Sequence, residues 1–243
     1  RLRADRAKLL GYNTHADIVL ETRMAKTPGN VLNLLNDLLE RSLVVAKRER
    51  EEMQKIVDAE GGKFSIEPQD WWYYAEKLRK AKYDLDENEM KPYFSLDNAR
   101  DGAFAVAGKL YGITFTRIND IPLPHPDAQA FEVKEADGSH VGVLYMDFFP
   151  RESKRQGAWC GSYRDHQVVD GRKITPVVTI VGNLTPPAGD KPALLSMDDV
   201  LTLFHEFGHG LQGLFSENTY STTTVAWDIV ELPSQIMEHW ATQ

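Results

Sequence analysis

Cysteine is almost absent from this chain of 243 residues, in which Cys160 stands alone. A single cysteine excludes an internal disulfide and a thiolate metal cluster, and it fits a reducing compartment. Long apolar runs are absent as well: no stretch reaches about 18 consecutive apolar residues, so we expect no membrane-spanning segment. Internal repeats and low-complexity segments are also missing from the sequence.

Basic residues are outnumbered, with 28 Lys and Arg against 36 Asp and Glu, and the formal net charge is -8. No basic cluster with interleaved aromatic residues appears, so we expect no nucleic-acid partner. With 42% hydrophobic and 26% charged residues, the composition is that of an ordinary globular protein. The first residues do not resemble a signal peptide, and Gln243 falls within a predicted helix, so we expect a piece of a longer polypeptide.

The first part of the chain, residues 1–112, has the residue pattern of packed helices. Thr27 and Pro28 are typical of a helix N-cap and a first helical position, and the apolar residues after them recur at i, i+3 and i+4. Two glycines at 61–62 are expected to end that helix. Four consecutive aromatic residues at 71–74 begin another helix. Because they cover every face of it, we expect burial on several sides, with an aromatic ligand platform as the alternative.

The pattern changes to strands over residues 113–182. Alternating apolar residues on both sides of Asp137 and Gly138 are typical of a β-hairpin, and a later apolar run predicts a further strand. After this region, Ser196 and Asp199 have the spacing of a capping box at the start of another helix. We therefore predict a mainly α fold with a small antiparallel β-sheet, in the α+β class.

The stretch that carries chemistry is His205-Glu206-Phe207-Gly208-His209. On a helix, side chains four residues apart lie about 40° apart around the axis and roughly 6 Å apart along it, so both imidazoles can bind one cation. The Glu206 carboxylate can reach a water next to the metal without being a ligand. A zinc hydrolase is therefore the hypothesis. The alternative is a pair of core histidines that bond to backbone or carboxylate groups.

A catalytic zinc site takes a third protein ligand and keeps one position open. Glu231 lies far enough after His209 for the chain to return and present a carboxylate from a second helix, which would complete a His2Glu site. The competing residues are Glu217, Asp228, Glu238 and His239. Of these, Glu217 follows the motif too closely to swing back, and Asp228 has the position of a helix cap.

The residues after the motif make the sequence recognisable. Residues 205–215 (HEFGHGLQGLF) and 230–235 (VELPSQ) together resemble the thimet oligopeptidase family of zinc metallopeptidases, and within it the peptidyl-dipeptidase Dcp and oligopeptidase A group. The resemblance covers nearly the whole chain, with further matching stretches at residues 70–74, 110–112, 147–152 and 157–159.

The resemblance implies a role for each residue of the motif. His205, His209 and Glu231 correspond to the family's zinc ligands, with one ion per chain. Glu206 corresponds to its general base, which takes a proton from the attacking water.

Two departures from the family pattern accompany these matches. Gln212 stands where the family often has a further histidine, which is not a zinc ligand, so the metal site survives the change. At residues 221–224 a Ser-Thr-Thr-Thr stretch replaces the Ser-Gly-Thr of many relatives, which bears on what that loop does for substrate.

The resemblance also implies a fold and a function. Residues 1–243 would be part of one zincin-like, neurolysin-type catalytic domain, with helices over 1–112, a small β-sheet over 113–182 and zinc-binding helices over 196–243. The expected activity is hydrolysis of short peptides, as an oligopeptidase or a peptidyl-dipeptidase, by a monomer in the cytoplasm or, alternatively, the periplasm. A non-catalytic zinc-stabilised module, a metal-free interaction domain and an inactive truncated fragment are the other hypotheses.

Further residues are expected around the site. Glu238 follows Glu231 by two helical turns, so we expect it to bond a ligand imidazole, with a plain surface carboxylate as the alternative. Gly157 and Ala158 are expected to hold substrate through their backbone, as at a strand edge, with a structural loop as the alternative. Four histidines outside the motif are expected to be solvent-exposed: His15, His125, His140 and His166.

Overall fold

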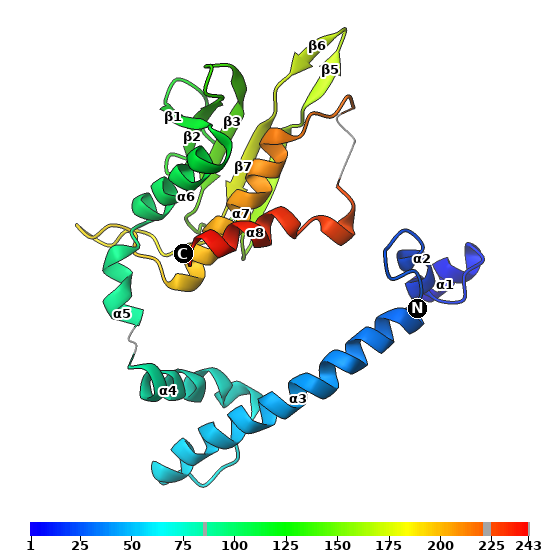
Figure 1. The fold of residues 1–243 in the computed structure, drawn as a ribbon, viewed down its shortest axis with the longest axis vertical. Helices are drawn as coiled ribbons and strands as arrows, with labels where there is room; N and C mark the ends of the chain where they lie inside the picture. Colours follow the sequence, from blue (N-terminus) through cyan, green and yellow to red (C-terminus); the bar gives the residue numbers. More distant parts are fainter. Residues whose placement is uncertain (85–86, 221–224, 243) are drawn as a thin grey trace. The chain divides into compact units, whose positions relative to one another are not determined.

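The computed structural model describes residues 1–84, 87–220 and 225–242. The chain divides into two compact units, residues 1–86 and residues 87–243 (Figure 1). The first unit contains α1 (Leu2–Leu9), α2 (His15–Leu20), α3 (Pro28–Ala59), the 3-10 helix η1 (Pro68–Asp70) and α4 (Trp71–Tyr83). None of the helices in the described ranges combines the length and the apolar composition that crossing a bilayer needs.

The longest element of the first unit is α3, and it starts at the predicted cap. Thr27 Oγ1 accepts a hydrogen bond from the Asn30 N–H at 3.2 Å, and Pro28 is the first helical residue. The helix ends before Gly61, whose φ of 78° is a left-handed conformation that glycine adopts without strain. Much of its apolar face is exposed, including Leu34, Leu35, Leu38 and Leu39.

The core of the first unit is small. Its buried apolar side chains are Met53, Val57, Ile66 and Tyr74. The prediction that the aromatic helix is buried on several sides is wrong, because Trp72 is 82% exposed and Tyr73 is 60% exposed. The physical reason is that α4 packs on this small core along one side only, and the exposed rings leave the ligand-platform alternative open.

The second unit is an α+β arrangement, as predicted. Its helical elements are α5 (Glu87–Met90), the 3-10 helix η2 (Lys91–Tyr93), α6 (Leu96–Tyr111), α7 (Met197–Phe215), the 3-10 helix η3 (Trp227–Ile229) and α8 (Leu232–Trp240). Its strands are β1 (Thr114–Ile118), β2 (Gln129–Lys134), β3 (His140–Asp147), β4 (Trp159–Arg164), β5 (Gln167–Val169), β6 (Arg172–Ile174) and β7 (Val177–Val181).

The main sheet has five strands in the order β1-β2-β3-β7-β4, and β5 pairs with β6 in a separate two-stranded sheet. The predicted hairpin around Asp137 and Gly138 is confirmed, because β2 and β3 are antiparallel neighbours. The prediction of an antiparallel sheet is wrong for one pair: β3 and β7 are parallel. The reason is that β7 enters between β3 and β4, which run in opposite directions. One of its two pairings must therefore be parallel, and this is the pairing with β3.

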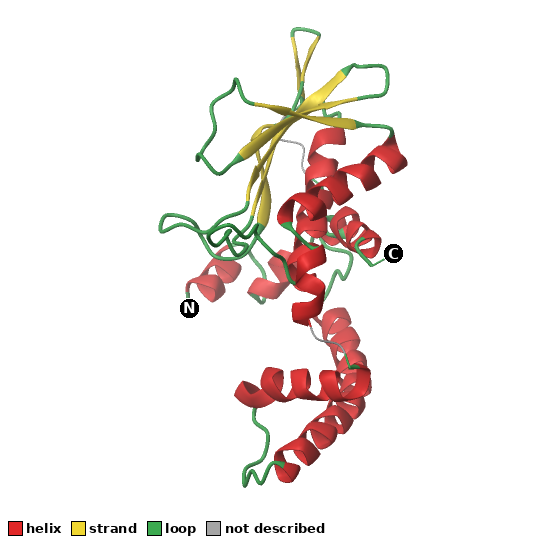
Figure 2. Ribbon diagram, turned by 90° about the vertical axis from the view of Figure 1, so that its left-hand side faces the viewer, coloured by secondary structure: helices red, strands yellow, loops and turns green. Residues whose placement is uncertain are grey.

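The main core lies between the sheet and helices α6 and α7. Figure 1 shows α7 running beside β7, and Figure 2 shows the twisted strands next to the helices of the same unit. The capping box predicted for α7 is confirmed, because the Ser196 hydroxyl accepts from the Asp199 N–H and the Asp199 carboxylate accepts from the Ser196 N–H. The core side chains around α7 include Phe131, Leu144, Ile180, Leu203, Phe207 and Leu211.

A buried charge cluster fixes the loop between β3 and β4. Asp147 Oδ2 lies 2.8 Å from Arg151 Nη2, and Asp147 Oδ1 lies 2.9 Å from Lys154 Nζ. Burial raises the pKa of the Asp147 carboxyl, but hydrogen bonds from both cations outweigh it and the net pKa is lowered. Burial lowers the pKa of Lys154, against the attraction of Asp147. Lys154 also donates to the Phe149 carbonyl at 2.8 Å, so it ties the loop together.

Candidate metal centre

Two helices bring the three expected ligand side chains together. α7 carries His205 and His209, whose ring centroids are 4.9 Å apart, and Glu231 occupies the N-cap position of α8. Glu231 Oε2 lies 3.2 Å from His205 Nε2 and 3.0 Å from His209 Nε2. One donor atom from each of the three residues lies within 4.8 Å of the other two, so the three can face one ion.

This donor set fits a zinc ion. Two ligand atoms about 2.1 Å from one ion at a tetrahedral angle lie roughly 3.4 Å apart, close to the carboxylate–imidazole separations in this site. Burial lowers the pKa of His209, against the attraction of Glu231, and this favours the neutral imidazole that binds metal. The hydrogen bond from Ser234 is the main reason that the pKa of Glu231 is lowered. These contacts would also satisfy a metal-free histidine pair, so they do not distinguish the two hypotheses.

The surroundings of Glu206 favour the metal-dependent hydrolase over the metal-free histidine pair. Glu206 is 8% exposed, and its Oε2 is a buried oxygen with no hydrogen-bond partner among the described residues. Burial raises the pKa of its carboxyl and Glu231 raises it further, while His205 and the Cys160 N–H act in the opposite direction. A structural histidine pair has no need of a buried carboxylate oxygen without a partner beside it. A hydrolase does, because such an oxygen can accept a proton from water.

Two further side chains of α8 contact the expected ligands. Glu238 Oε1 lies 2.6 Å from His205 Nδ1, so Glu238 reaches an imidazole as expected. Ser234 is 0% exposed, and its Oγ lies 2.9 Å from Glu231 Oε2. Sequence reasoning missed Ser234. The available signal was a hydroxyl three residues after a carboxylate at a helix start, a spacing that puts both side chains on one face.

The site opens into a cavity of about 760 Å³ that follows an edge strand. The cavity is lined by His205, Glu206, His209 and Glu231 together with Ala158 and β4 residues Trp159, Cys160, Gly161 and Ser162. Gly157 makes the turn into β4 with a φ of 85°. The Asn183 side-chain amide holds this turn, because it donates to the Arg155 and Gly157 carbonyls, both at 2.7 Å.

The competing ligand candidates are not part of this cluster in the described ranges. Glu217 Oε1 pairs with Lys173 Nζ at 2.6 Å, and His239 lies in the last turn of α8. Asp228 lies inside η3, and the N-cap of η3 is Ala226, so the prediction of a cap at Asp228 is wrong. Residues 221–224, where the sequence departs from the family pattern, lie outside the described residues.

The other histidines differ in exposure. The prediction that His166 is solvent-exposed is wrong: it is buried, and its Nδ1 donates to the Asn218 carbonyl at 2.9 Å. The reason is that the segment before β5 packs against the chain that follows α7. His140 is exposed, as predicted, while His15 and His125 are half-buried.

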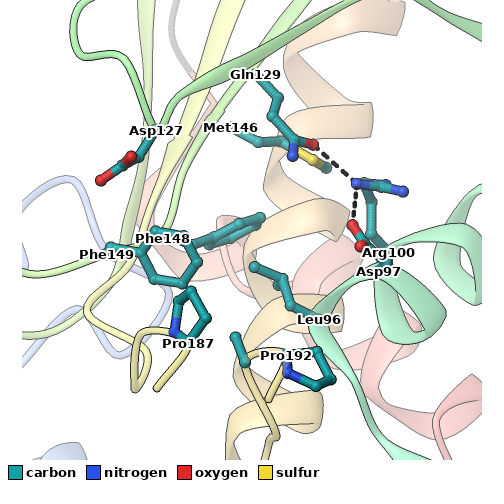
Figure 3. A pocket seen from close by; sticks show the side chains of 11 residues that line it. Leu96, Asp97, Arg100, Asp127, Gln129, Met146, Phe148, Phe149, Pro187 and Pro192 are labelled. Atoms are coloured by element: carbon teal, nitrogen blue, oxygen red, sulfur yellow. Dashed lines mark hydrogen bonds and ion pairs between the residues drawn. The ribbon is translucent and has the colours of Figure 1, made fainter. Parts of the chain in front are cut away.

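A second, smaller cavity does not have this chemistry. It measures about 180 Å³ and is lined by residues of α6, the sheet and the loop after β7 (Figure 3). Most of its side chains are apolar, and its basic group, Arg100, is already paired: Arg100 Nη1 lies 2.6 Å from Asp97 Oδ1 and 2.8 Å from Gln129 Oε1. We therefore take the cavity at the histidines as the candidate site.

Two imidazoles on one helix, a carboxylate from the next helix and a buried glutamate with one oxygen left without a partner are the features of a metal-dependent hydrolase centre. The comparison with protein families agrees with this class. Residues 1–243 match the profile of peptidase family M3, and the chain belongs to this family of metallopeptidases.

Curated relatives carry peptidase names. The chain is 43% identical over 245 residues to the dipeptidyl carboxypeptidase of Escherichia coli K12 and 37% identical over 244 residues to oligopeptidase A of the same strain. It is 30% identical over 258 residues to saccharolysin of Saccharomyces cerevisiae. These alignments cover 98% or 99% of this chain but 36% of each relative, so the chain spans about a third of their length.

Proposed function

We propose that this protein hydrolyses peptide bonds in short peptides with the help of one zinc ion per chain. The observation that carries the proposal is the convergence of His205 Nε2, His209 Nε2 and Glu231 Oε2 beside the unpaired Glu206 Oε2, in one cavity. Membership of peptidase family M3 and the names of the relatives support the reaction class.

Four side chains would form and orient the metal site. His205, His209 and Glu231 would hold the ion, and Glu238 would fix the ring orientation of His205 through Nδ1. When bound, zinc supplies Lewis acidity that activates a water molecule and polarises the carbonyl of the scissile bond.

Glu206 would move the proton. Its Oε2 would accept a proton from the attacking water and later deliver it to the nitrogen of the leaving amine. Burial helps the first transfer, because a raised pKa makes this carboxylate a stronger base toward the water proton.

The edge strand β4 would hold the substrate. An edge strand has backbone N–H and C=O groups that an extended peptide can pair with, and Ala158 and the start of β4 line the cavity. Asn183 holds the turn at Gly157, and this turn would then fix the position of the start of β4 relative to the two histidines.

The wider proposal follows the family. We propose a zincin-like, neurolysin-type fold in which residues 1–243 form part of one catalytic domain, with helices over 1–112, the sheet over 113–182 and the zinc-binding helices over 196–243. The substrates would be short peptides, taken by a monomer in the cytoplasm or, alternatively, the periplasm. The two alternatives are release of C-terminal dipeptides, as by a peptidyl-dipeptidase, and cleavage of internal bonds, as by an oligopeptidase.

The test is Glu206→Gln, with Glu217→Gln as the matched control. Glu206→Gln should keep zinc at the wild-type ratio, measured by metal analysis, and lower hydrolysis of a fluorogenic peptide by roughly 10²- to 10⁴-fold. Glu217→Gln removes an exposed carboxylate that contacts Lys173 and should leave both measurements unchanged. Loss of zinc together with activity in Glu206→Gln would contradict the role of a proton carrier.

The other hypotheses predict different results for the wild-type protein. Bound zinc without chelator-sensitive hydrolysis favours a zinc-stabilised module or an inactive fragment. Absence of zinc after purification and zinc titration favours the metal-free interaction domain.

A further inference from the structure

Ser234 is a fully buried hydroxyl whose partner is the expected third ligand. It is 0% exposed and lies in the first turn of α8. Its Oγ is 2.9 Å from Glu231 Oε2 and 2.9 Å from the Glu231 carbonyl oxygen. A hydroxyl has one hydrogen to donate, so one of these two oxygens receives it at any moment.

The carboxylate oxygen is the better acceptor of the two. The Glu231 carbonyl already accepts the Gln235 N–H at 2.9 Å as the first hydrogen bond of α8. The carboxylate is charged, and hydrogen bonds to charged acceptors are roughly twice as strong as those between neutral groups. The Ser234 hydrogen is therefore directed to Oε2, the same atom that faces both histidine Nε2 atoms.

Close packing of α7 on α8 confines the Ser234 side chain. A Cβ atom at Gly208 would lie 2.6 Å from the Pro233 carbonyl oxygen and 2.6 Å from the Ser234 Cα, so the two backbones touch at this point. Because a glycine of α7 meets the first turn of α8, Ser234 has little freedom to move away from Glu231.

Glu231 is the expected ligand that most needs such support. Its side chain is 50% exposed, whereas those of His205 and His209 are 27% and 19% exposed. A half-exposed glutamate has three rotatable side-chain bonds and would otherwise sample many rotamers. Glu238 holds His205, and Ser234 is placed to do the same for Glu231.

We infer that Ser234 is a positioning residue for metal binding: its hydroxyl holds Glu231 Oε2 toward the two imidazoles. This inference rests on the proposed zinc site. The hydroxyl would touch neither the ion nor the substrate, and its whole effect would pass through Glu231.

The experiment is a zinc competition titration against a chromophoric chelator, with the purified protein. Ser234→Ala should bind zinc roughly 10- to 100-fold more weakly than wild type, the range seen for loss of a residue that supports a ligand. Ser234→Thr retains the hydroxyl and should recover most of the affinity. Ser216→Ala is the matched control, because the Ser216 hydroxyl bonds the Gln212 carbonyl and no ligand, and it should bind zinc like wild type.

A double variant separates an effect of Ser234 that passes through Glu231 from an effect on the packing of α8. With Glu231→Gln present, adding Ser234→Ala should change zinc affinity by less than about 2-fold, because the carboxylate through which Ser234 acts is gone. An equal loss in both backgrounds, or no loss in either, overturns the inference while the zinc site itself stands. Failure of the wild-type protein to bind zinc overturns both the inference and the proposed function.

Discussion

The two units of this chain build long helices from similar patterns and use them differently. α3, in the unit of residues 1–86, has 32 residues, of which Met53 and Val57 are buried. α7, in the unit of residues 87–243, has 19 residues and buries nine of them. Both helices start at a capping side chain, so the local sequence specifies the start of each helix equally well.

The difference lies in what covers the apolar face. α7 packs against the sheet and α8, and a large core on that side holds the helix that carries His205 and His209. Among the described residues of its own unit, α3 packs on a small cluster, and the side chains of Leu34, Leu35, Leu38 and Leu39 are more than half exposed. The spacing of apolar residues therefore predicts which face of a helix is apolar. Whether that face can support a site depends on the elements that pack against it. Three matched pairs of substitutions test this contrast.

The largest expected difference concerns charge. Asp147→Asn leaves the buried Lys154 without its counter-charge and should lower the free energy of unfolding by about 3–5 kcal/mol. Asp37→Asn in α3 removes an ion pair to Arg41 in which both side chains are more than half exposed, and should cause no measurable change. Urea denaturation at pH 7, followed by circular dichroism, measures both. Equal changes in unfolding free energy for the two variants would mean that water reaches the Asp147 cluster and screens its charges.

The Asp147 contribution should also depend on pH. Its pKa is lowered in the folded protein, so its stabilisation is complete above the unfolded value of about 3.9 and is lost as the pH falls through the lower folded value. The gap in unfolding free energy between wild type and Asp147→Asn should therefore narrow below about pH 4. A difference in unfolding free energy that grows below about pH 4 would contradict the lowered pKa of Asp147.

The second pair compares one substitution on the two helices. Leu211 of α7 is 3% exposed, so Leu211→Ala should lower the free energy of unfolding by about 2–5 kcal/mol. Leu35 of α3 is 53% exposed, so Leu35→Ala should stay within about 0.5 kcal/mol of wild type. Thermal and urea unfolding of both variants decide the matter. A large loss in Leu35→Ala would show that the leucine face of α3 is covered in solution.

The third pair compares glycines, and its effect should be the smallest. Gly208→Ala forces α7 and α8 apart and should cost about 1–3 kcal/mol, with weaker zinc binding because Glu231 moves with α8. At Gly29 of α3, a Cβ would lie 3.9 Å from the Thr27 Oγ1, an ordinary contact. Gly29→Ala should therefore leave stability unchanged or raise it by up to about 1 kcal/mol. The same unfolding measurements apply, and a harmless Gly208→Ala would contradict the backbone contact.

The features that sequence reasoning could reach are local or carried by spacing. The caps at Thr27 and Ser196 and the hairpin at Asp137 depend on neighbouring residues, and the structure confirms them. Two histidines four residues apart share a helix face in any helix, so their closeness follows from helical geometry alone. The approach of Glu231 does not, because it depends on how α8 docks. For that residue the spacing offered one candidate among several, and the family resemblance singled it out.

The features that sequence reasoning missed are set by distant partners. The parallel pairing of β3 with β7 depends on the order in which strands enter the sheet, which alternation does not encode. The exposure of Trp72 and the burial of His166 depend on which surface each residue meets. Ser234 resembles any serine in the first turn of a helix until the Glu231 rotamer and the Gly208 contact are known.

The nine-residue helix α8 and its N-cap carry three residues of the site: the ligand candidate Glu231, its support Ser234, and Glu238, which supports His205 of α7. Under the proposed zinc chemistry, assembly of the site is then a single docking equilibrium of α8 on α7, and the apparent zinc affinity is the intrinsic affinity multiplied by the docked fraction. Linkage works in the other direction as well: zinc at 100 times its dissociation constant would stabilise the docked position of α8 by about 2.7 kcal/mol. Bound metal would therefore stabilise the docking of α8 on α7. After addition of a chelator, the amide hydrogens of α8 would exchange with solvent before those of α7.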